Sequence, residues 1–199
     1  KVLKFQRCAA DAAVYTHQRE GARFYVAIYV DDILIFGPRD ATHISWIKAS
    51  LAKEFEMKDL GAPSTFLGLE ITRGRAARTI SLSQGAYVDS VLHRFGFDGS
   101  APAVTPVAPG TNVGPLVTKD LYDHNPREHL YRQIVGALMY LMLGTRPNLA
   151  FAVSLASRYA SNPMEDHMKL VKRTLRYIRG TRDTTLVLGA SVPDFGQGA

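Results

Sequence analysis

The chain has 199 residues, of which 46% are hydrophobic and 21% charged, and these proportions exclude a disordered chain and indicate a folded globular one. Lysine and arginine outnumber aspartate and glutamate by 24 to 18, an excess that is compatible with a nucleic-acid partner without requiring one. A single cysteine excludes an internal disulfide and a paired-cysteine zinc site, and the longest apolar stretch is far shorter than the roughly 20 residues of a membrane span.

A nearly continuous apolar segment near the beginning of the chain is interrupted by Asp31 and Asp32. Its β-branched and aromatic residues predict two strands, residues 24–30 and 33–36, joined by a very tight turn. The first strand is apolar on both faces, so we expect other elements to cover this hairpin.

The sequence next predicts a helix, two short strands around an arginine-rich turn, and a second helix: residues 42–57, 65–71, 79–82 and 83–95. Apolar residues repeat at helical spacing along the first helix, which gives it a core-facing stripe of Ile44, Ile47, Leu51 and Phe55. Gly96 marks the end of the second helix.

A proline-rich stretch separates this half of the chain from a helical half. Five of the ten prolines lie between residues 98 and 126, and we interpret residues 109–128 as a linker. Beyond it the pattern predicts three helices, at about residues 131–143, 147–159 and 164–179, separated by Gly or Pro.

The two adjacent carboxylates are the first candidate for chemistry. Crowded like charges are costly unless a cation neutralises them, and two-metal phosphoryl-transfer sites use clustered carboxylates to hold their ions. The alternative is a solvated turn, because Asp is a common turn residue, and the Asp31-Asp32 dipeptide by itself favours this alternative.

The flanking residues reverse that preference. Tyr29-Val30-Asp31-Asp32 between two hydrophobic strands resembles the YxDD box of reverse transcriptases. The resemblance implies that Asp31 and Asp32 are the catalytic, metal-binding carboxylates, with Asp31 as the metal ligand and Asp32 beside it. It also implies that Tyr29 and Val30 form the floor of the active site near the primer end.

Further stretches narrow the family to the copia-type LTR retrotransposons. They follow one another in that family's order and spacing, at residues 57–61, 66–71, 80–87, 131–153 and 172–181. The resemblance extends over about residues 1–188. It implies an α+β fold, in which an incomplete reverse-transcriptase palm with a YxDD β-hairpin is followed by a thumb and a helical connection segment.

The same resemblance implies a division into domains. Residues 1–71 would be the C-terminal part of the palm, with a primer-grip strand at Phe66, Leu67 and Gly68. Residues 72–108 would be a thumb-like segment and residues 129–188 the helical connection toward an RNase H domain. Residues 189–199 would be a truncated tail, and whether Asp194 belongs to an RNase H site stays open.

By this resemblance the parent protein is an RNA-directed DNA polymerase that transfers nucleotides with two Mg²⁺ (or Mn²⁺) ions. Its partners would be an RNA template, a DNA primer, the RNA–DNA hybrid and deoxynucleoside triphosphates, with no membrane and an open oligomeric state. We expect an intracellular, cytoplasmic location in a virus-like particle, with a nuclear phase as an open alternative.

The chain begins with Lys1 rather than Met, and we expect the upstream catalytic Asp and the nucleotide-binding fingers to be missing. We therefore predict that this fragment is inactive alone. Two alternatives remain: a non-catalytic nucleic-acid-binding remnant of a degenerate transposable element, and a generic two-metal nuclease. The host, the template preference and the activity of the element are not determined by the sequence.

The last predicted helix has a basic face and an apolar face. The apolar face consists of Val171, Thr174, Leu175 and Ile178, and the basic face consists of Lys169, Lys172, Arg173, Arg176 and Arg179. The basic face is either a solvated surface or a row of cations that contacts the phosphate backbone of a duplex without reading its sequence. The polymerase resemblance favours the second interpretation.

Overall fold

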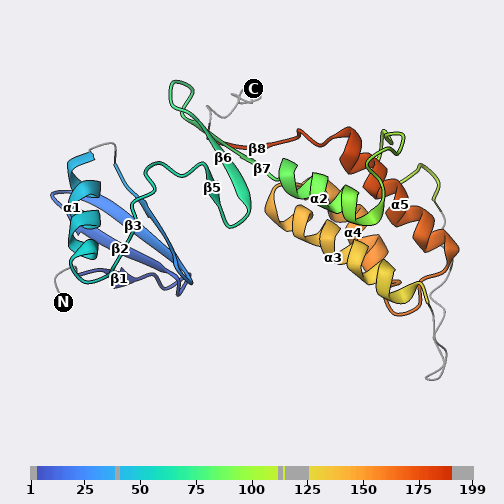
Figure 1. The fold of residues 1–199 in the computed structure, drawn as a ribbon, viewed down its shortest axis with the longest axis horizontal. Helices are drawn as coiled ribbons and strands as arrows, with labels where there is room; N and C mark the ends of the chain where they lie inside the picture. The colour runs from blue at the N-terminus through green and yellow to red at the C-terminus, as the bar shows by residue number, and fades with distance from the viewer. Residues whose placement is uncertain (1–3, 39–40, 112–113, 115–125, 190–199) are drawn as a thin grey trace, which may run out of the picture. The chain divides into compact units, whose positions relative to one another are not determined.

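The computed structural model describes residues 4–38, 41–111, 114 and 126–189, and these form two antiparallel sheets and five α-helices (Figure 1). The chain divides into two compact units, residues 1–62 and 63–199. The combination of antiparallel sheets with separate helices agrees with the predicted α+β class.

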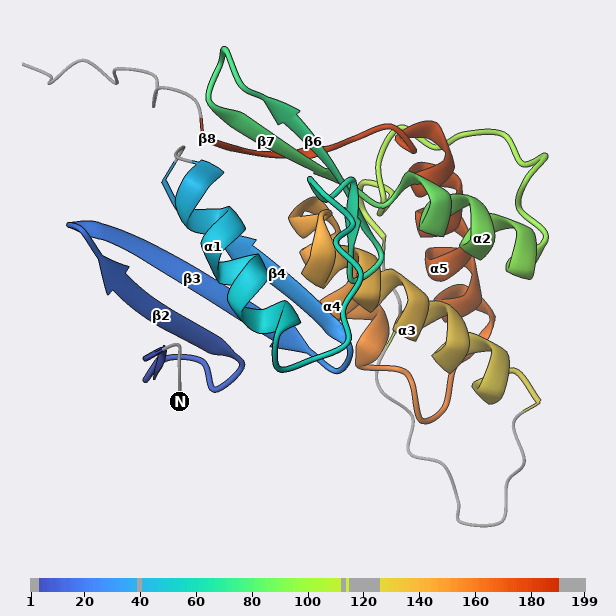
Figure 2. The same ribbon diagram turned by 60° about the vertical axis from the view of Figure 1, so that its left-hand side comes forward.

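The first unit is a four-stranded antiparallel sheet with a helix on one of its faces (Figure 2). The strands follow one another in the order of the sequence, as β1 (Gln6–Arg7), β2 (Val14–Arg19), β3 (Ala22–Tyr29) and β4 (Asp32–Phe36). Helix α1 (Ala41–Ala52) comes next. Strands β1 and β2 were not predicted from the sequence.

The core of this unit lies between α1 and one face of the sheet. Phe24 and Val26 of β3 are 1% and 5% exposed, and Ile47 of α1 is fully buried against them. Gly37 makes this packing possible, because a Cβ at that position would lie 2.5 Å from Cδ1 of the Phe24 ring. The apolar pattern of α1 therefore positions the β3–β4 hairpin.

The opposite face of the same sheet is less covered than predicted. Residues directly opposite each other share a face, so Tyr25 pairs with Phe36, and their rings stack with centroids 5.1 Å apart. Phe36 is nevertheless 41% exposed, and the described part of this unit has no helix on that face. Within the first unit, the expected covering of the hairpin by another element is therefore present on one face.

Helix α1 is shorter than predicted. It ends at Ala52, and the following residues form a turn in which the amides of Glu54 and Phe55 donate to the carbonyl of Leu51. Phe55 is 61% exposed, so its assignment to the apolar stripe was wrong. Its spacing matched the helical period, but the chain leaves the helix before reaching it.

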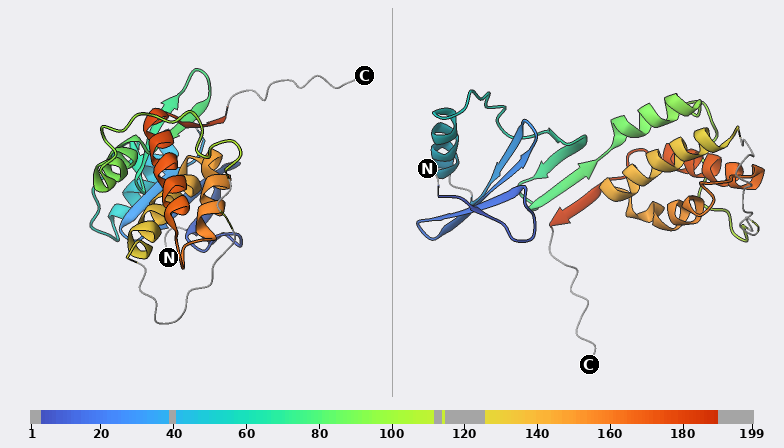
Figure 3. Two further views of the ribbon diagram at one scale, coloured as in Figure 1. Left: turned by 90° about the vertical axis from the view of Figure 1, so that its right-hand side faces the viewer. Right: turned by 90° about the horizontal axis from the view of Figure 1, so that it is seen from below.

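The second unit contains the other sheet, in the order β5-β6-β7-β8. Its strands are β5 (Thr65–Phe66), β6 (Leu69–Gly74), β7 (Thr79–Ser83) and β8 (Leu186–Gly189). The predicted strand at residues 65–71 is in fact a hairpin, because the chain turns at Leu67 and Gly68. Strand β8 was not predicted, and it brings the C-terminal part of the described chain alongside β7 (Figure 3).

The helices of the second unit share one hydrophobic core. They are α2 (Gly85–Phe95), α3 (Glu128–Gly144), the 3₁₀ turn η1 (Pro147–Leu149), α4 (Ala150–Ser157) and α5 (Glu165–Gly180). The predicted positions of these helices are confirmed. The predicted apolar face of α5 is also buried, with Val171, Leu175 and Ile178 at 0% exposure and Thr174 at 1%.

The proline-rich stretch before α3 is only partly described. Of the predicted linker, residues 109–128, positions 112–113 and 115–125 lie outside the described residues, as does the predicted tail apart from Gly189. The preceding segment packs on α5, since the Ala103 amide donates to the Arg176 carbonyl and the Thr174 hydroxyl donates to the Pro106 carbonyl. The predicted domain boundaries stay predictions.

Two glycines of α3 predict opposite effects of the same substitution. A Cβ at Gly136 would meet nothing within 4 Å, so Gly136→Ala should stabilise the second unit by about 0.5–1 kcal/mol through helix propensity. A Cβ at Gly144 would collide with the buried Gln84 side chain, so Gly144→Ala should cost about 1–3 kcal/mol. Urea unfolding followed by the helical circular dichroism signal measures the stability of both variants. Equal changes in the free energy of unfolding would contradict this packing.

Candidate active site

The β3–β4 hairpin places the carboxylate pair at a two-residue turn. Tyr29 pairs with Asp32 at the end of the ladder, which leaves Val30 and Asp31 as the turn. Val30 has φ 52°, a left-handed conformation that is strained for a β-branched residue. Glycine is the usual residue where a short hairpin turn needs positive φ, so the turn keeps valine at a conformational cost.

The side chains at this tip are open to solvent. Tyr29 is 57% exposed and Val30 is 82% exposed, and both carboxylates are exposed as well. Neither the Asp31 nor the Asp32 carboxylate forms a side-chain hydrogen bond or an ion pair with any residue of the described chain. The two like charges are therefore hydrated rather than neutralised by a protein cation, and their oxygens are available to a ligand.

The register also decides the direction of the pair. Asp32 lies opposite Tyr29, so these two residues share the face of the sheet that α1 does not cover. Tyr25 and Phe36 lie on the same face, because each is an even number of positions from Tyr29 or Asp32 along its strand. The turn therefore presents an acidic tip next to an accessible aromatic surface.

Carboxylate oxygens suit a hard divalent cation such as Mg²⁺, but a Mg²⁺ ion takes six ligands in total. Among the described residues there is no cluster of three or more His, Cys, Asp or Glu side chains arranged to hold a metal. Asp11 precedes the hairpin in the sequence, and its Oδ1 accepts a hydrogen bond from the Ala13 amide at 2.8 Å. The pair therefore fits part of a metal site.

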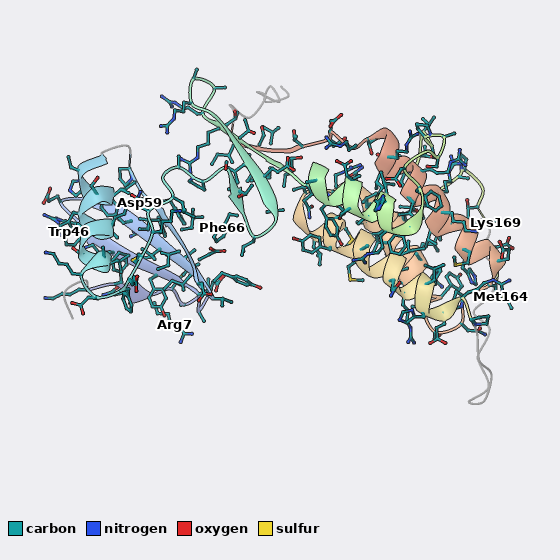
Figure 4. All side chains as sticks on the ribbon, viewed as in Figure 1. Arg7, Trp46, Asp59, Phe66, Met164 and Lys169 are labelled. Atoms are coloured by element: carbon teal, nitrogen blue, oxygen red, sulfur yellow. The ribbon has the colours of Figure 1, made fainter. Side chains whose placement is uncertain are left out.

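The second candidate element is the β5–β6 hairpin, which lies in the second unit. Phe66, labelled in Figure 4, is half-buried and pairs with Leu69 across the turn. Leu67 and Gly68 both have positive φ, 51° and 76°, the pattern of a tight two-residue turn. The predicted primer-grip residues thus come together as a turn rather than as a continuous strand.

Two contacts attach this hairpin to the helices. The Tyr140 hydroxyl of α3 donates to the Leu67 carbonyl at 3.2 Å, and the Ala86 amide at the start of α2 donates to Glu70 Oε1 at 3.1 Å. A Cβ at Gly68 would lie 2.8 Å from the Tyr140 hydroxyl, so glycine is needed for the close approach as well as for the turn. The helical core therefore fixes the hairpin.

The basic residues of α5 have partners within the chain. Lys169, labelled in Figure 4, forms an ion pair with Asp166 at 2.7 Å, and Lys172 is exposed with no such partner among the described residues. The three arginines donate to main-chain carbonyls of the segment that follows α2. Their acceptors are those of Thr105 for Arg173, Ala101 for Arg176, and Asp98 and Ser100 for Arg179.

This arrangement gives the three arginines a structural role that the sequence analysis did not foresee. Each guanidinium carries five N–H donors, so bonds to carbonyls leave donors over, but they fix where the charge lies. Contact of the α5 stripe with a phosphate backbone stays a prediction, and it rests most directly on Lys172, because Lys169 is paired with Asp166.

Arg146 is a further residue that the sequence analysis missed. It is 1% exposed, and its guanidinium donates to the carbonyl and the hydroxyl of Thr181, at 2.9 and 2.6 Å, and to Oδ1 of Asn148 at 3.2 Å. Burial lowers the pKa of this guanidinium, and the nearby Tyr177 opposes that shift. In the sequence, Arg146 stands out only as part of the stretch Thr145-Arg146-Pro147-Asn148. Its guanidinium joins η1 to the end of α5.

A second buried polar group lies in the same core. The Tyr131 hydroxyl of α3 donates to the Ala156 carbonyl of α4 at 2.8 Å, and burial raises the pKa of this hydroxyl above its ordinary value. The tyrosine therefore stays neutral and acts as a structural donor between two helices.

The first unit thus presents an acidic turn on an antiparallel hairpin, in a sheet that one helix covers. The sequence that contains this hairpin also matches a known protein family. Residues 1–109 match the family described as reverse transcriptase (RNA-dependent DNA polymerase). The match covers more than half of the chain, which therefore belongs to the reverse transcriptase family.

The relatives define the branch of that family. The chain is 38% identical over 196 residues, 97% of its length, to the retrovirus-related Pol polyprotein from transposon TNT 1-94 of Nicotiana tabacum. It is 36% identical over 179 residues, 90% of its length, to the Pol polyprotein from transposon RE1 of Arabidopsis thaliana. The resemblance to copia-type retrotransposon polymerases is thereby confirmed.

The matched region is a small part of these relatives, since the chain spans 15% of the tobacco polyprotein and 12% of the RE1 polyprotein. A shorter relative, the putative transposon Ty5-1 protein YCL074W of Saccharomyces cerevisiae, is 30% identical over 186 residues, 94% of the chain and 58% of that protein. No solved structure matches the chain. Within the described residues, every helix is too short or too polar to cross a membrane.

The strained turn makes a prediction about stability. Val30→Gly removes the Cβ that opposes the positive φ and should stabilise the first unit by about 0.5–1 kcal/mol after the greater chain entropy of glycine is subtracted. Val30→Ala keeps the Cβ and should change the stability little. Trp46, the single tryptophan, lies in α1, so urea unfolding followed by its fluorescence reports on this unit. Stability gains that are equal in the two variants would show that the turn is not strained.

Proposed function

We propose that this chain supplies the catalytic hairpin of an RNA-directed DNA polymerase, with Asp31 as a metal ligand and Asp32 as the accessory carboxylate. The observation that carries the proposal is the pair of exposed, unpartnered carboxylates at the turn of an antiparallel hairpin in a chain of the reverse transcriptase family. Two adjacent aspartates that only served a turn would gain nothing from a strained valine before them.

The chemistry of such a site is nucleotidyl transfer from a deoxynucleoside triphosphate to a primer. When bound, Mg²⁺ (or Mn²⁺) would neutralise the charge of the transferring phosphoryl group and would lower the pKa of the primer 3′-hydroxyl. Asp31 and Asp32 contribute ligand oxygens on one side of the site. A further carboxylate ligand would be supplied by the part of the parent polymerase that lies upstream of the hairpin.

The other hairpin residues serve to position the nucleic acid. Tyr29 and Val30 offer exposed apolar surface beside the carboxylates, on which the last base pair of a primer and its RNA template rests. Phe66, Leu67 and Gly68 form a rigid turn held by Tyr140, which suits them to support the primer backbone. In this proposal the RNA–DNA hybrid is the product, and each hairpin contacts it.

Metal binding can be tested on the chain by itself. Mn²⁺ added to the isotopically labelled chain should broaden the backbone amide resonances of residues 29–33, because a paramagnetic ion at the Asp31 carboxylate lies close to them. Asp31→Asn should abolish this local broadening, and Asp32→Asn should weaken it. Asp11→Asn is the matched control, since its carboxylate already accepts the Ala13 amide. Broadening that survives Asp31→Asn would refute the assignment.

Activity needs a longer protein. The chain alone should not extend a primer on an RNA template, whereas a chimera in which it replaces the matching 15% of the tobacco polyprotein should do so. Asp31→Asn in that chimera should lower kcat by about 10²–10³-fold, because loss of a metal ligand removes several kcal/mol of transition-state stabilisation. Mn²⁺ binding at Asp31 together with a chimera that binds duplex but never extends it would favour the non-catalytic remnant.

A further inference from the structure

The β6–β7 hairpin carries three arginines within six positions. Arg73 is the residue before the end of β6 and pairs with Ile80, and Arg75 and Arg78 lie in the four-residue connection between Gly74 and Thr79. All three side chains are exposed. The intervening and flanking residues from Ile71 to Gln84 include no aspartate or glutamate, so the hairpin has a local charge of +3.

Among the described residues, the guanidiniums of Arg73, Arg75 and Arg78 have no hydrogen-bond or ion-pair partner, in contrast to those of α5. The arginines of α5 donate to loop carbonyls, and Lys169 is paired with Asp166. Surface guanidiniums without a protein partner can neutralise phosphates directly, and the cations that the nucleic acid then releases drive the binding.

We propose that the β6–β7 hairpin is a contact surface for the phosphate backbone of a nucleic-acid duplex. The guanidinium fork matches a phosphate in a bidentate geometry. The hydroxyls of Thr72 and Ser81 lie on the face opposite to that of the Arg73–Ile80 pair, so the arginines make the phosphate contacts of this surface. Contacts between cations and phosphates fix the position of a duplex without reading its bases.

The position of the hairpin in its sheet supports a duplex as the ligand. This step rests on the proposed function. Strand β6 begins immediately after the Leu67–Gly68 turn and ends at the arginines, a distance of about 17–20 Å at the rise of a strand. A duplex advances about 3.4 Å per base pair, so a primer end held at the turn brings the backbone about five or six base pairs behind it to the arginines.

The test measures binding of the full 199-residue chain to a fluorescein-labelled RNA–DNA hybrid of mixed sequence, by anisotropy between about 50 and 200 mM salt. The triple variant Arg73→Ala, Arg75→Ala, Arg78→Ala should bind more weakly and reduce the slope of log K against log salt by about two to three units. The corresponding triple lysine variant should keep most of the slope, because it keeps the charge. Circular dichroism should be unchanged in both, since the three side chains are exposed and form no hydrogen bond or ion pair among the described residues.

The matched control is the double variant Lys169→Ala, Lys172→Ala on α5, which removes two exposed cations from the same unit and should change the slope less. A slope that drops for the α5 variant and not for the hairpin variant would overturn the inference while leaving the proposed function intact. Absence of hybrid binding by the parent chain would also overturn it, and the Mn²⁺ experiment then judges the proposed function independently. Equal competition by polyglutamate would reduce the hairpin to a general polyanion site and would likewise count against it.

Discussion

Main-chain carbonyls outside helices and strands still need hydrogen-bond donors. In the second unit, arginine side chains donate to several of these carbonyls. The pattern recurs at several loops, where the donor and acceptor are Arg132 and Ala160, Arg146 and Thr181, Arg173 and Thr105, Arg176 and Ala101, and Arg179 and Asp98. Each bond joins segments far apart in sequence. The helices share a hydrophobic core, but these bonds determine how the irregular segments between them lie against α5 and η1. These five of the chain's 24 basic residues therefore have a structural role.

That constraint separates two kinds of positive charge. An arginine bonded to a carbonyl keeps its charge but has a fixed position, whereas an arginine without a partner can meet a ligand at little conformational cost. The β6–β7 hairpin carries the second kind, and it belongs to the same sheet as the Leu67–Gly68 turn. The sheet of the second unit thus links a turn anchored by Tyr140 to a free cationic loop through one strand, β6.

The acidic hairpin obeys a different constraint. Two adjacent carboxylates cannot be buried without a cation, so they occupy the exposed end of a strand pair whose other face supports the core. The left-handed Val30 at this turn is a local violation of backbone preference, and such violations concentrate at sites where geometry serves function. Phe24, Val26 and Ile47 make the small core that holds the strands beneath it.

Local pattern predicted much of this architecture. The apolar run broken by Asp31 and Asp32 indicated the hairpin strands, and helical periodicity located α2 to α5, because the buried stripe of a helix repeats every three to four residues. The β5–β6 hairpin was read as one strand, since Leu67 gives no sign of positive φ. Strand β8 was missed because its partner β7 lies about a hundred residues earlier, and short-range pattern does not encode such pairings.

The candidate site shows the same division. The sequence by itself determined the family, the identity of the carboxylates and the amphipathic division of α5, because each depends on residue type and local spacing. Only the tertiary structure decided that Asp31 and Asp32 are unpartnered, that Tyr140 holds the Leu67 turn, and that the α5 arginines bind carbonyls while Arg73, Arg75 and Arg78 remain free. Those outcomes depend on which backbone groups, distant in sequence, approach each side chain in the fold. The sequence near a charged residue does not show whether a carbonyl from a distant loop will accept a hydrogen bond from it.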